Sequence, residues 1–117
     1  MARYMLLLRD RIGEFDDVSP EEMQKVIQAY GAWCEKLGAQ HLGGEKLCDG
    51  EGRLLRGADG KMAVTDGPFA EAKEVFGGFF LVEAEGYDAA QSLAADCPHL
   101  QFGSIEIRAV EEMEGPS

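Results

Sequence analysis

Residues 3–8 read Arg-Tyr-Met-Leu-Leu-Leu, a short and nearly continuous apolar run that predicts a strand buried on both faces. Residues 79–84, Phe-Phe-Leu-Val-Glu-Ala, predict a second strand of the same kind. Neighbouring side chains of a strand point to opposite faces of its sheet, so Tyr4 and Met5 face opposite ways although both are apolar. The sheet that holds these strands is therefore expected to have two apolar faces.

The clearest helix is predicted over residues 19–38. Ser19 is a good N-cap, Pro20 suits the first helical position, Glu22 completes a capping box and Gly38 is a typical stop. Gly31, inside the helix and beside its apolar stripe, suggests a close approach of another backbone. Apolar residues spaced three and four apart form that stripe, with its aromatic members expected in the core: Met23, Val26, Ile27, Tyr30, Trp33, Cys34 and Leu37.

The remaining elements are predicted from apolar runs separated by glycine and proline residues, which form turns and end helices. Leu54-Leu55-Arg56 and Met62-Ala63-Val64-Thr65 flank Asp59-Gly60, which is a strong hairpin signal within a β region over 41–65. The other predictions are a connecting segment over 66–78, a helix over 87–97 ended by Pro98, a strand over 104–110 and an acidic, mobile tail over 111–117.

The order of these elements predicts an α+β fold of the ferredoxin-like, split βαβ class, with an added β-hairpin, in one domain over residues 1–110. Two helices cover only one face of such a sheet. The second apolar face therefore needs another cover, and the simplest is the same face of a second copy. The sequence predicts a two-fold homodimer formed through the sheet.

The chain has 22 acidic and 11 basic residues and a formal net charge of −11. An acidic surface repels phosphate groups, which argues against nucleic acid or an anionic membrane as partners. Cys34, Cys48 and Cys97 are odd in number and far apart, so neither a disulfide framework nor a zinc finger is indicated. No signal peptide or membrane-spanning run is recognised, and a cytoplasmic location is expected.

The first candidate site is Asp66-Gly67-Pro68-Phe69-Ala70-Glu71-Ala72-Lys73-Glu74, which follows a predicted strand. Loops at strand ends often hold functional groups on a rigid scaffold. Asp66, Glu71 and Glu74 suit acid–base roles, and Lys73 suits binding of an anionic substrate. The structural alternative is a simple turn, in which Asp66 caps its own backbone and Phe69 fills the core.

The second candidate is Asp96-Cys97-Pro98-His99, at the end of the second predicted helix. The imidazole of His99 suits proton transfer, although a histidine after a helix stop is commonly a surface or capping residue. Cys97 falls on the apolar face and is expected in the core. A metal site built from His41, Cys48, Cys97 and His99 lacks the local spacing of zinc motifs, so no metal is predicted.

The stretch Asp66-Gly67-Pro68-Phe69, continuing to Gly77-Gly78-Phe79, resembles the DGPF signature of the YCII-related family. The first strand, the Ser19-Pro20-Glu21-Glu22 helix start and the run from Cys97-Pro98 to Arg108 are also similar to that family. The resemblance extends to Val110. It implies a bacterial, cytoplasmic protein that forms a dimeric α+β barrel, and its distant relatives include lyases, isomerases and dehydrochlorinases.

The broader family carries a histidine–aspartate pair, but its positions do not match here: no histidine follows Pro20, and Cys97 precedes Pro98 where an aspartate is usual. The hypothesis is therefore that Asp66 and His99 supply an equivalent pair. Lys73, Glu71, Phe69 and Pro98 would then bind substrate, with no cofactor, in an elimination, an isomerisation or a proton abstraction beside a carbonyl.

A non-catalytic reading stays open. Similar DGPF proteins are often encoded beside extracytoplasmic-function sigma factors, which suits a ligand-binding or regulatory module. In that reading Asp66 only caps its turn and His99 lies in solvent, whereas the enzyme reading requires both side chains in one pocket.

Overall fold

The computed structural model describes residues 1–11, 13, 16–48, 51–67 and 74–112 of the chain. It is an α+β fold in which four antiparallel strands form one sheet in the order β2-β5-β1-β6. The strands of this sheet are β1 (Ala2–Arg11), β2 (His41–Lys46), β5 (Glu74–Ala84) and β6 (Gly103–Ala109). The helical elements are α1 (Pro20–Leu37), η1 (Gly38–Gln40), α2 (Tyr87–Ala94) and η2 (Pro98–Gln101).

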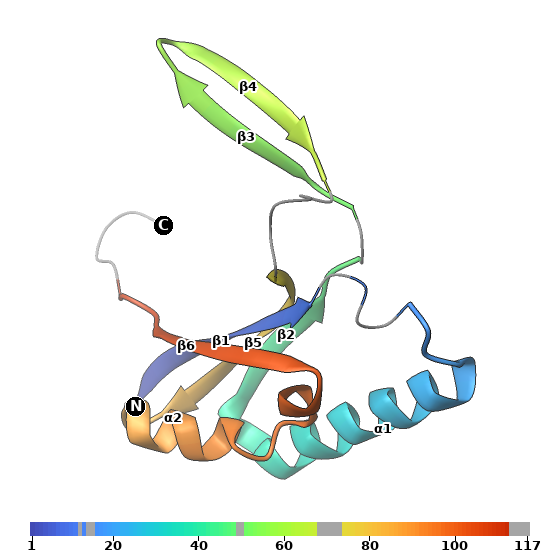
Figure 1. The fold of residues 1–117 in the computed structure, drawn as a ribbon. Helices are drawn as coiled ribbons and strands as arrows, with labels where there is room; N and C mark the ends of the chain where they lie inside the picture. The colour runs from blue at the N-terminus through green and yellow to red at the C-terminus, as the bar shows by residue number, and fades with distance from the viewer. Residues whose placement is uncertain (12, 14–15, 49–50, 68–73, 113–117) are drawn as a thin grey trace.

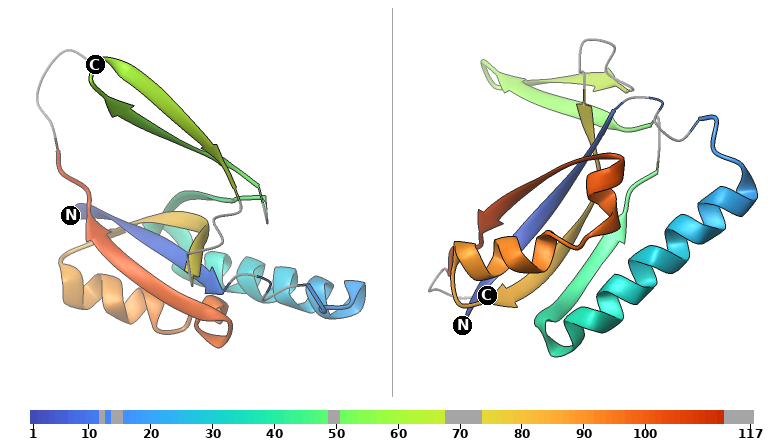
Figure 2. Two further views of the ribbon diagram at one scale, coloured as in Figure 1. Left: turned by 45° about the horizontal axis from the view of Figure 1, so that its top comes forward. Right: turned by 60° about the horizontal axis from the view of Figure 1, so that its bottom comes forward.

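The two α-helices lie side by side beneath one face of the sheet, and within the described residues no helix covers the other face (Figure 1). This arrangement confirms the ferredoxin-like class predicted from the order of the elements. The remaining two strands, β3 (Arg53–Ala58) and β4 (Lys61–Asp66), pair only with each other. They form the predicted hairpin, which projects away from the sheet on the side opposite the helices (Figures 1 and 2).

Helix α1 begins and ends where its capping residues predict. The Ser19 hydroxyl accepts a hydrogen bond from the Glu22 backbone N–H at 3.1 Å, and Pro20 is the first helical residue. Gly38 has a positive φ of 57° and donates its backbone N–H to the last turn of the helix. A Cβ added at Gly31 would meet nothing within 4 Å, so the close backbone approach expected there is wrong.

Two boundaries differ from the sequence predictions in ways that matter for the site. Strand β5 already begins at Glu74, within the expected 66–78 connecting segment, because its first residues pair with the end of β1 beyond an irregularity between Leu8 and Arg9. Helix α2 ends at Ala94 rather than 97, because Pro98 opens the separate η2 turn. Residues 68–73 and the final residues 113–117 of the expected tail lie outside the described part of the chain.

The core lies between the sheet and the C-terminal parts of the helices. Leu6 and Val82 are fully buried there, Trp33 donates its indole N–H to the Leu93 carbonyl at 3.0 Å, and Cys97 is buried as expected. On the opposite face of the sheet, the alternate residues of β1 and β5 pair across the two strands and remain partly exposed. These residues, which we call the open face, are Met5, Leu7, Phe79 and Leu81.

Candidate active site

A cavity of about 270 Å³ opens between the N-terminal half of α1 and one end of the sheet. Its walls are mostly apolar, and a few ionisable side chains converge in it, which is the usual character of a small-molecule site. The lining residues are Leu8, Asp10, Met23, Val26, Ile27, Tyr30, Gly44, Glu45, Lys46, Gly77, Gly78, Phe80 and His99.

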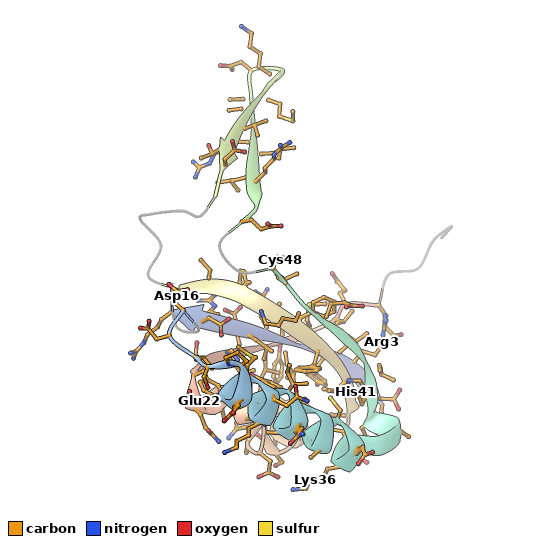
Figure 3. All side chains as sticks on the ribbon, turned by 90° about the vertical axis from the view of Figure 1, so that its right-hand side faces the viewer. Arg3, Asp16, Glu22, Lys36, His41 and Cys48 are labelled. Atoms are coloured by element: carbon orange, nitrogen blue, oxygen red, sulfur yellow. The ribbon has the colours of Figure 1, made fainter. Side chains whose placement is uncertain are left out.

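The apolar stripe of α1 has two different roles along its length. Trp33 and Leu37, in the last turns, are buried in the core. Met23 and Ile27, in the first turns, line the cavity instead, and Ile27 is 57% exposed. In Figure 3, Glu22 and Lys36 mark the two ends of this helix below the sheet. The same amphipathic pattern therefore builds core at one end and a pocket wall at the other.

His99 lies in the cavity wall and is only 2% exposed. Its Nε2 is 2.8 Å from the backbone carbonyl of Arg9, and its Nδ1 is 3.0 Å from the hydroxyl of Tyr30. Because a carbonyl only accepts hydrogen bonds, Nε2 must carry the proton. In the neutral ring Nδ1 is then an acceptor, so Tyr30 donates its O–H to His99.

Asp10 is the third polar side chain in this group and is 6% exposed. Its Oδ1 lies 3.4 Å from His99 Nε2, which is a charge contact once the imidazole is protonated. Asp10 reaches this place because it continues the alternation of Tyr4, Leu6 and Leu8 on the helix-covered face of β1. Two nearly buried groups interact more strongly than an exposed pair, because little water screens them.

Two glycines make room for these side chains. A Cβ added at Gly77 would overlap the carboxylate of Asp10. A Cβ added at Gly103 would overlap the Arg9 carbonyl and would lie 3.1 Å from His99 Nε2. The backbones of β5 and β6 can approach the Asp10–His99 pair only because these positions carry no side chain. Gly77 belongs to the glycine pair noted in the sequence, which thus serves close packing beside the cavity.

The pKa of Tyr30 is raised, first because burial disfavours the phenolate and then because the negative charges of nearby Cys97 and Asp10 would oppose it. Tyr30 is therefore a neutral phenol near neutral pH, able to carry a proton rather than a charge. Burial likewise raises the pKa of the Cys97 thiol to about 11. Cys97 is accordingly not an activated nucleophile.

The structure separates the two residues that the sequence hypothesis pairs. His99 faces the cavity and is not the surface or capping residue that its place after a helix stop suggested. Asp66 ends β4 in the hairpin, where its side chain is 81% exposed and lies 3.3 Å from Arg53. Asp66 does not line the cavity within this chain and lies at the base of the hairpin, where β4 ends.

The predicted substrate-binding residues are mostly outside the described part of the chain. Phe69, Glu71 and Lys73 belong to the segment 68–73, and of the Glu74 side chain nothing is described. Pro98 opens η2 directly before His99, so it positions the histidine without lining the cavity. At the mouth of the cavity, Glu45 and Lys46 from the end of β2 supply one side chain of each charge.

Asp10 and Tyr30 were not recognised as site residues from the sequence. Tyr30 was assigned to the core because it falls on the apolar stripe of α1, and the first strand was ended at Leu8. Extending the strand by two residues would have placed the Asp10 carboxylate on the helix-covered face, where a buried charge is unusual. The alternation of the first strand, continued to Asp10, was therefore the sequence signal that could have identified this site residue.

Among the described residues, no three histidine, cysteine, aspartate or glutamate side chains gather closely enough to hold a metal ion. His41, Cys48, Cys97 and His99 therefore do not form the cluster considered from the sequence. His41 instead lies beside Phe80, with ring centroids 5.8 Å apart, and Cys48 lies where the chain leaves β2 for the hairpin (Figure 3). Within the same described residues, no helix has the length and apolar character needed to cross a membrane.

Comparison with known proteins assigns the family. Residues 2–114 match the model of the YCII-related domain, so the chain belongs to the YCII-related family. A protein of Rhizobium meliloti (strain 1021), described as uncharacterized protein R00369, is 41% identical over 56 residues. That match covers 46% of this chain and 45% of the Rhizobium protein, so it spans less than half of either.

A solved structure shares the fold over almost the full length. It is the 5-chloro-2-hydroxyhydroquinone dehydrochlorinase TftG from Burkholderia phenoliruptrix AC1100, in complex with 2,5-dihydroxybenzoquinone. The TM-score is 0.56, with 20% sequence identity and 95% of both chains covered. At this identity the similarity concerns the fold, and the chemistry of this chain has to be argued from its own residues.

Proposed function

We propose that this chain is a small-molecule enzyme that works by general acid–base chemistry in the α1 cavity, without a metal. The observation that carries the proposal is the buried hydrogen-bonded chain from Tyr30 through His99 to the Arg9 carbonyl, with Asp10 beside it. Ionisable groups that are buried, mutually connected and open to an apolar cavity are the usual equipment for proton transfer.

The geometry supports a specific direction of proton movement. A substrate proton passes to the Tyr30 oxygen while the Tyr30 proton passes to Nδ1 of His99. The imidazolium that results is held between the Arg9 carbonyl and the Asp10 carboxylate, which favour its positive charge. Tyr30 is neutral before and after the transfer, and the substrate is left as an anion. Return of the proton elsewhere gives isomerisation, and loss of an anionic leaving group gives elimination.

The cavity favours a small ring compound with one acidic hydroxyl or an acidic C–H beside a carbonyl. Leu8, Val26 and Phe80 offer apolar walls to the ring, and Tyr30, His99 and Asp10 supply the connected polar group. The fold shared with a dehydrochlorinase agrees with this class. We therefore propose a hydroxyquinone or halogenated hydroquinone as the first compounds to test, with loss of halide as the reaction.

The test combines binding and turnover on the full chain. We expect 2,5-dihydroxybenzoquinone to bind, and 5-chloro-2-hydroxyhydroquinone to release chloride. Tyr30→Phe removes only the transferable proton, so chloride release should fall about 10²–10⁴-fold while quinone binding changes little. Ile27→Trp fills the exposed wall of the cavity and should weaken binding itself.

Asp66→Asn is the control that separates this site from the hairpin. Its side chain is exposed and forms an ion pair with the exposed Arg53, so the substitution should leave turnover unchanged and cost less than about 1 kcal/mol of stability. Equal turnover by the parent and Tyr30→Phe would contradict the relay. Binding of the quinone without turnover of any ring compound would favour the alternative of a non-catalytic ligand-binding or regulatory module.

The finer family and assembly assignments are also proposals. The sequence Asp66-Gly67-Pro68-Phe69 supports membership of the DGPF subgroup. The apolar open face supports a homodimer formed through the sheet, as in a dimeric α+β barrel. The acidic net charge of −11 supports a cytoplasmic location.

A further inference from the structure

We propose that the β3–β4 hairpin is an intermolecular arm that packs on the body of a second copy of this chain. All residues of both six-residue strands are exposed. A two-stranded hairpin by itself is at best marginally stable in water. A hairpin of this length whose strands, among the described residues, pair with each other and with no third strand needs a surface to pack on. The inference does not depend on the proposed catalytic activity.

One face of the hairpin is suited to such packing. Leu55 lies directly opposite Val64, and Met62 follows on the same face across from Gly57. These three side chains, which we call the arm stripe, are 56%, 50% and 62% exposed. The opposite face carries Arg56, Lys61 and the Leu54–Thr65 pair, while the Arg53–Asp66 ion pair lies on the face of the arm stripe, at the base of the hairpin. The larger apolar side chains are therefore concentrated in the arm stripe, which gains most from leaving water.

The charge of the arm identifies the occupant as a second copy. Residues 53–66 contain three basic and two acidic side chains, for a net charge of +1, whereas the whole chain has a net charge of −11. The rest of the chain thus carries −12. A slightly basic arm is attracted to an acidic body, while two acidic bodies repel each other. Between two copies, contact of the arm with the body is therefore electrostatically more favourable than contact of one body with the other.

The exposed area agrees with an intermolecular role. The accessible surface of the chain is 8666 Å², whereas a compact monomer of its 12.7 kDa mass exposes about 6,200 Å². The radius of gyration is 16.4 Å, against about 13.4 Å for a compact domain of this length. The excess surface exceeds the roughly 800 Å² that each partner buries in an interface of standard size.

The direction of the arm also fits. It extends on the side of the sheet opposite the helices, which is the side of the open face (Figures 1 and 3). A second copy that approaches the open face therefore comes within reach of the arm. The arm and the open face then form parts of one continuous contact between the two copies.

The test uses two matched double variants of the full chain. The first variant, Leu55→Asp with Val64→Asp, places two charges on the arm stripe. The second, Leu54→Asp with Thr65→Asp, places the same two charges at the next pair of residues, on the other face of the hairpin. In sedimentation experiments we expect the parent to be a dimer. The arm-stripe variant should dissociate at least about tenfold more readily, while the opposite-face variant keeps the parent's dissociation constant.

A second measurement places the arm directly. Leu55 is replaced by p-benzoylphenylalanine, and isotope-labelled and unlabelled copies are mixed before irradiation. Cross-links that join a labelled to an unlabelled chain are the expected result. A monomeric parent, equal dissociation of the two double variants, or cross-links confined to single chains would each overturn the proposal. A monomeric parent would direct the search to a different protein as the partner of the arm.

Discussion

The position of Asp10 in the site depends on the absence of a side chain at Gly77. The carboxylate of Asp10 occupies the space that a side chain at position 77 would need. We expect Gly77→Ala to displace Asp10 from His99, to cost about 1–3 kcal/mol of stability and to reduce turnover. Urea unfolding and chloride release measure the two effects. Gly57→Ala is the control, because a Cβ there meets only one atom, at 3.9 Å.

Cys97 gives a prediction for the pH dependence of stability. Its usual pKa of 9.0 is raised to about 11 in the folded chain, chiefly by burial. Between these values the unfolded chain has lost the thiol proton and the folded chain retains it. Stability is therefore complete below pH 9 and is lost as the pH rises to 11, on the order of 2 kcal/mol for this group.

The check is urea unfolding of the parent and of Cys97→Ala between pH 8 and 11. The pKa of Tyr30 is also raised, so its contribution to stability likewise declines above pH 10 and should persist in the variant. Cys97→Ala should thus flatten only part of the pH dependence. Identical slopes for the two proteins would mean that the Cys97 thiol titrates equally in both states.

The sequence allowed His99 to be chosen as a candidate but not its partners. Its chemistry suggested proton transfer, whereas its burial and its bonds to Arg9 and Tyr30 arise from contacts 90 and 69 positions apart in the chain. Local spacing carries no information about such contacts. Asp66 shows the opposite case, because a residue type suited to acid–base work lies at the exposed base of the hairpin, beside Arg53 and outside the cavity.

At the scale of elements, α1 was predictable almost to the residue because its signals are local. Its cap, first-turn proline and terminal glycine each act on the neighbouring turn of backbone. The start of β5 was missed because only pairing with the distant end of β1 makes residues 74–78 a strand. Propensity cannot report that pairing, since glycines 77 and 78 by themselves favour a loop.

Helix α1 also provides a stability prediction. Gly31 has no positive φ, and a Cβ there meets nothing within 4 Å. Gly31→Ala should therefore stabilise the fold by about 0.5–1 kcal/mol, because the unfolded chain loses conformational freedom and the helix loses no contact. Gly38→Ala is the matched control and should destabilise, since its φ of 57° disfavours a side chain. Urea unfolding distinguishes the two, and a loss of stability in Gly31→Ala would contradict the argument.

At the scale of the whole molecule, the open face is the main feature that a single copy does not account for. Met5 and Leu81 pair across β1 and β5, as do Leu7 and Phe79, and all four remain partly exposed on the helix-free side. An apolar patch of this kind on a chain with a net charge of −11 favours association only if its burial outweighs the repulsion between acidic bodies. High salt, which screens that repulsion, should then strengthen the dimer.

This balance leads to a prediction for thermal unfolding. If unfolding separates two copies, a tenfold rise in protein concentration adds about 1.4 kcal/mol of stability and raises Tm by roughly 3–5 °C. Leu7→Glu places a charge in the centre of the open face and should make Tm independent of concentration, whereas Leu7→Met, which keeps the apolar volume, should behave as the parent. Scanning calorimetry over two decades of concentration is the measurement. The Tm of a dimer that dissociates on unfolding must depend on protein concentration. A parent whose Tm does not change over that range would therefore contradict the proposal that a second copy covers the open face.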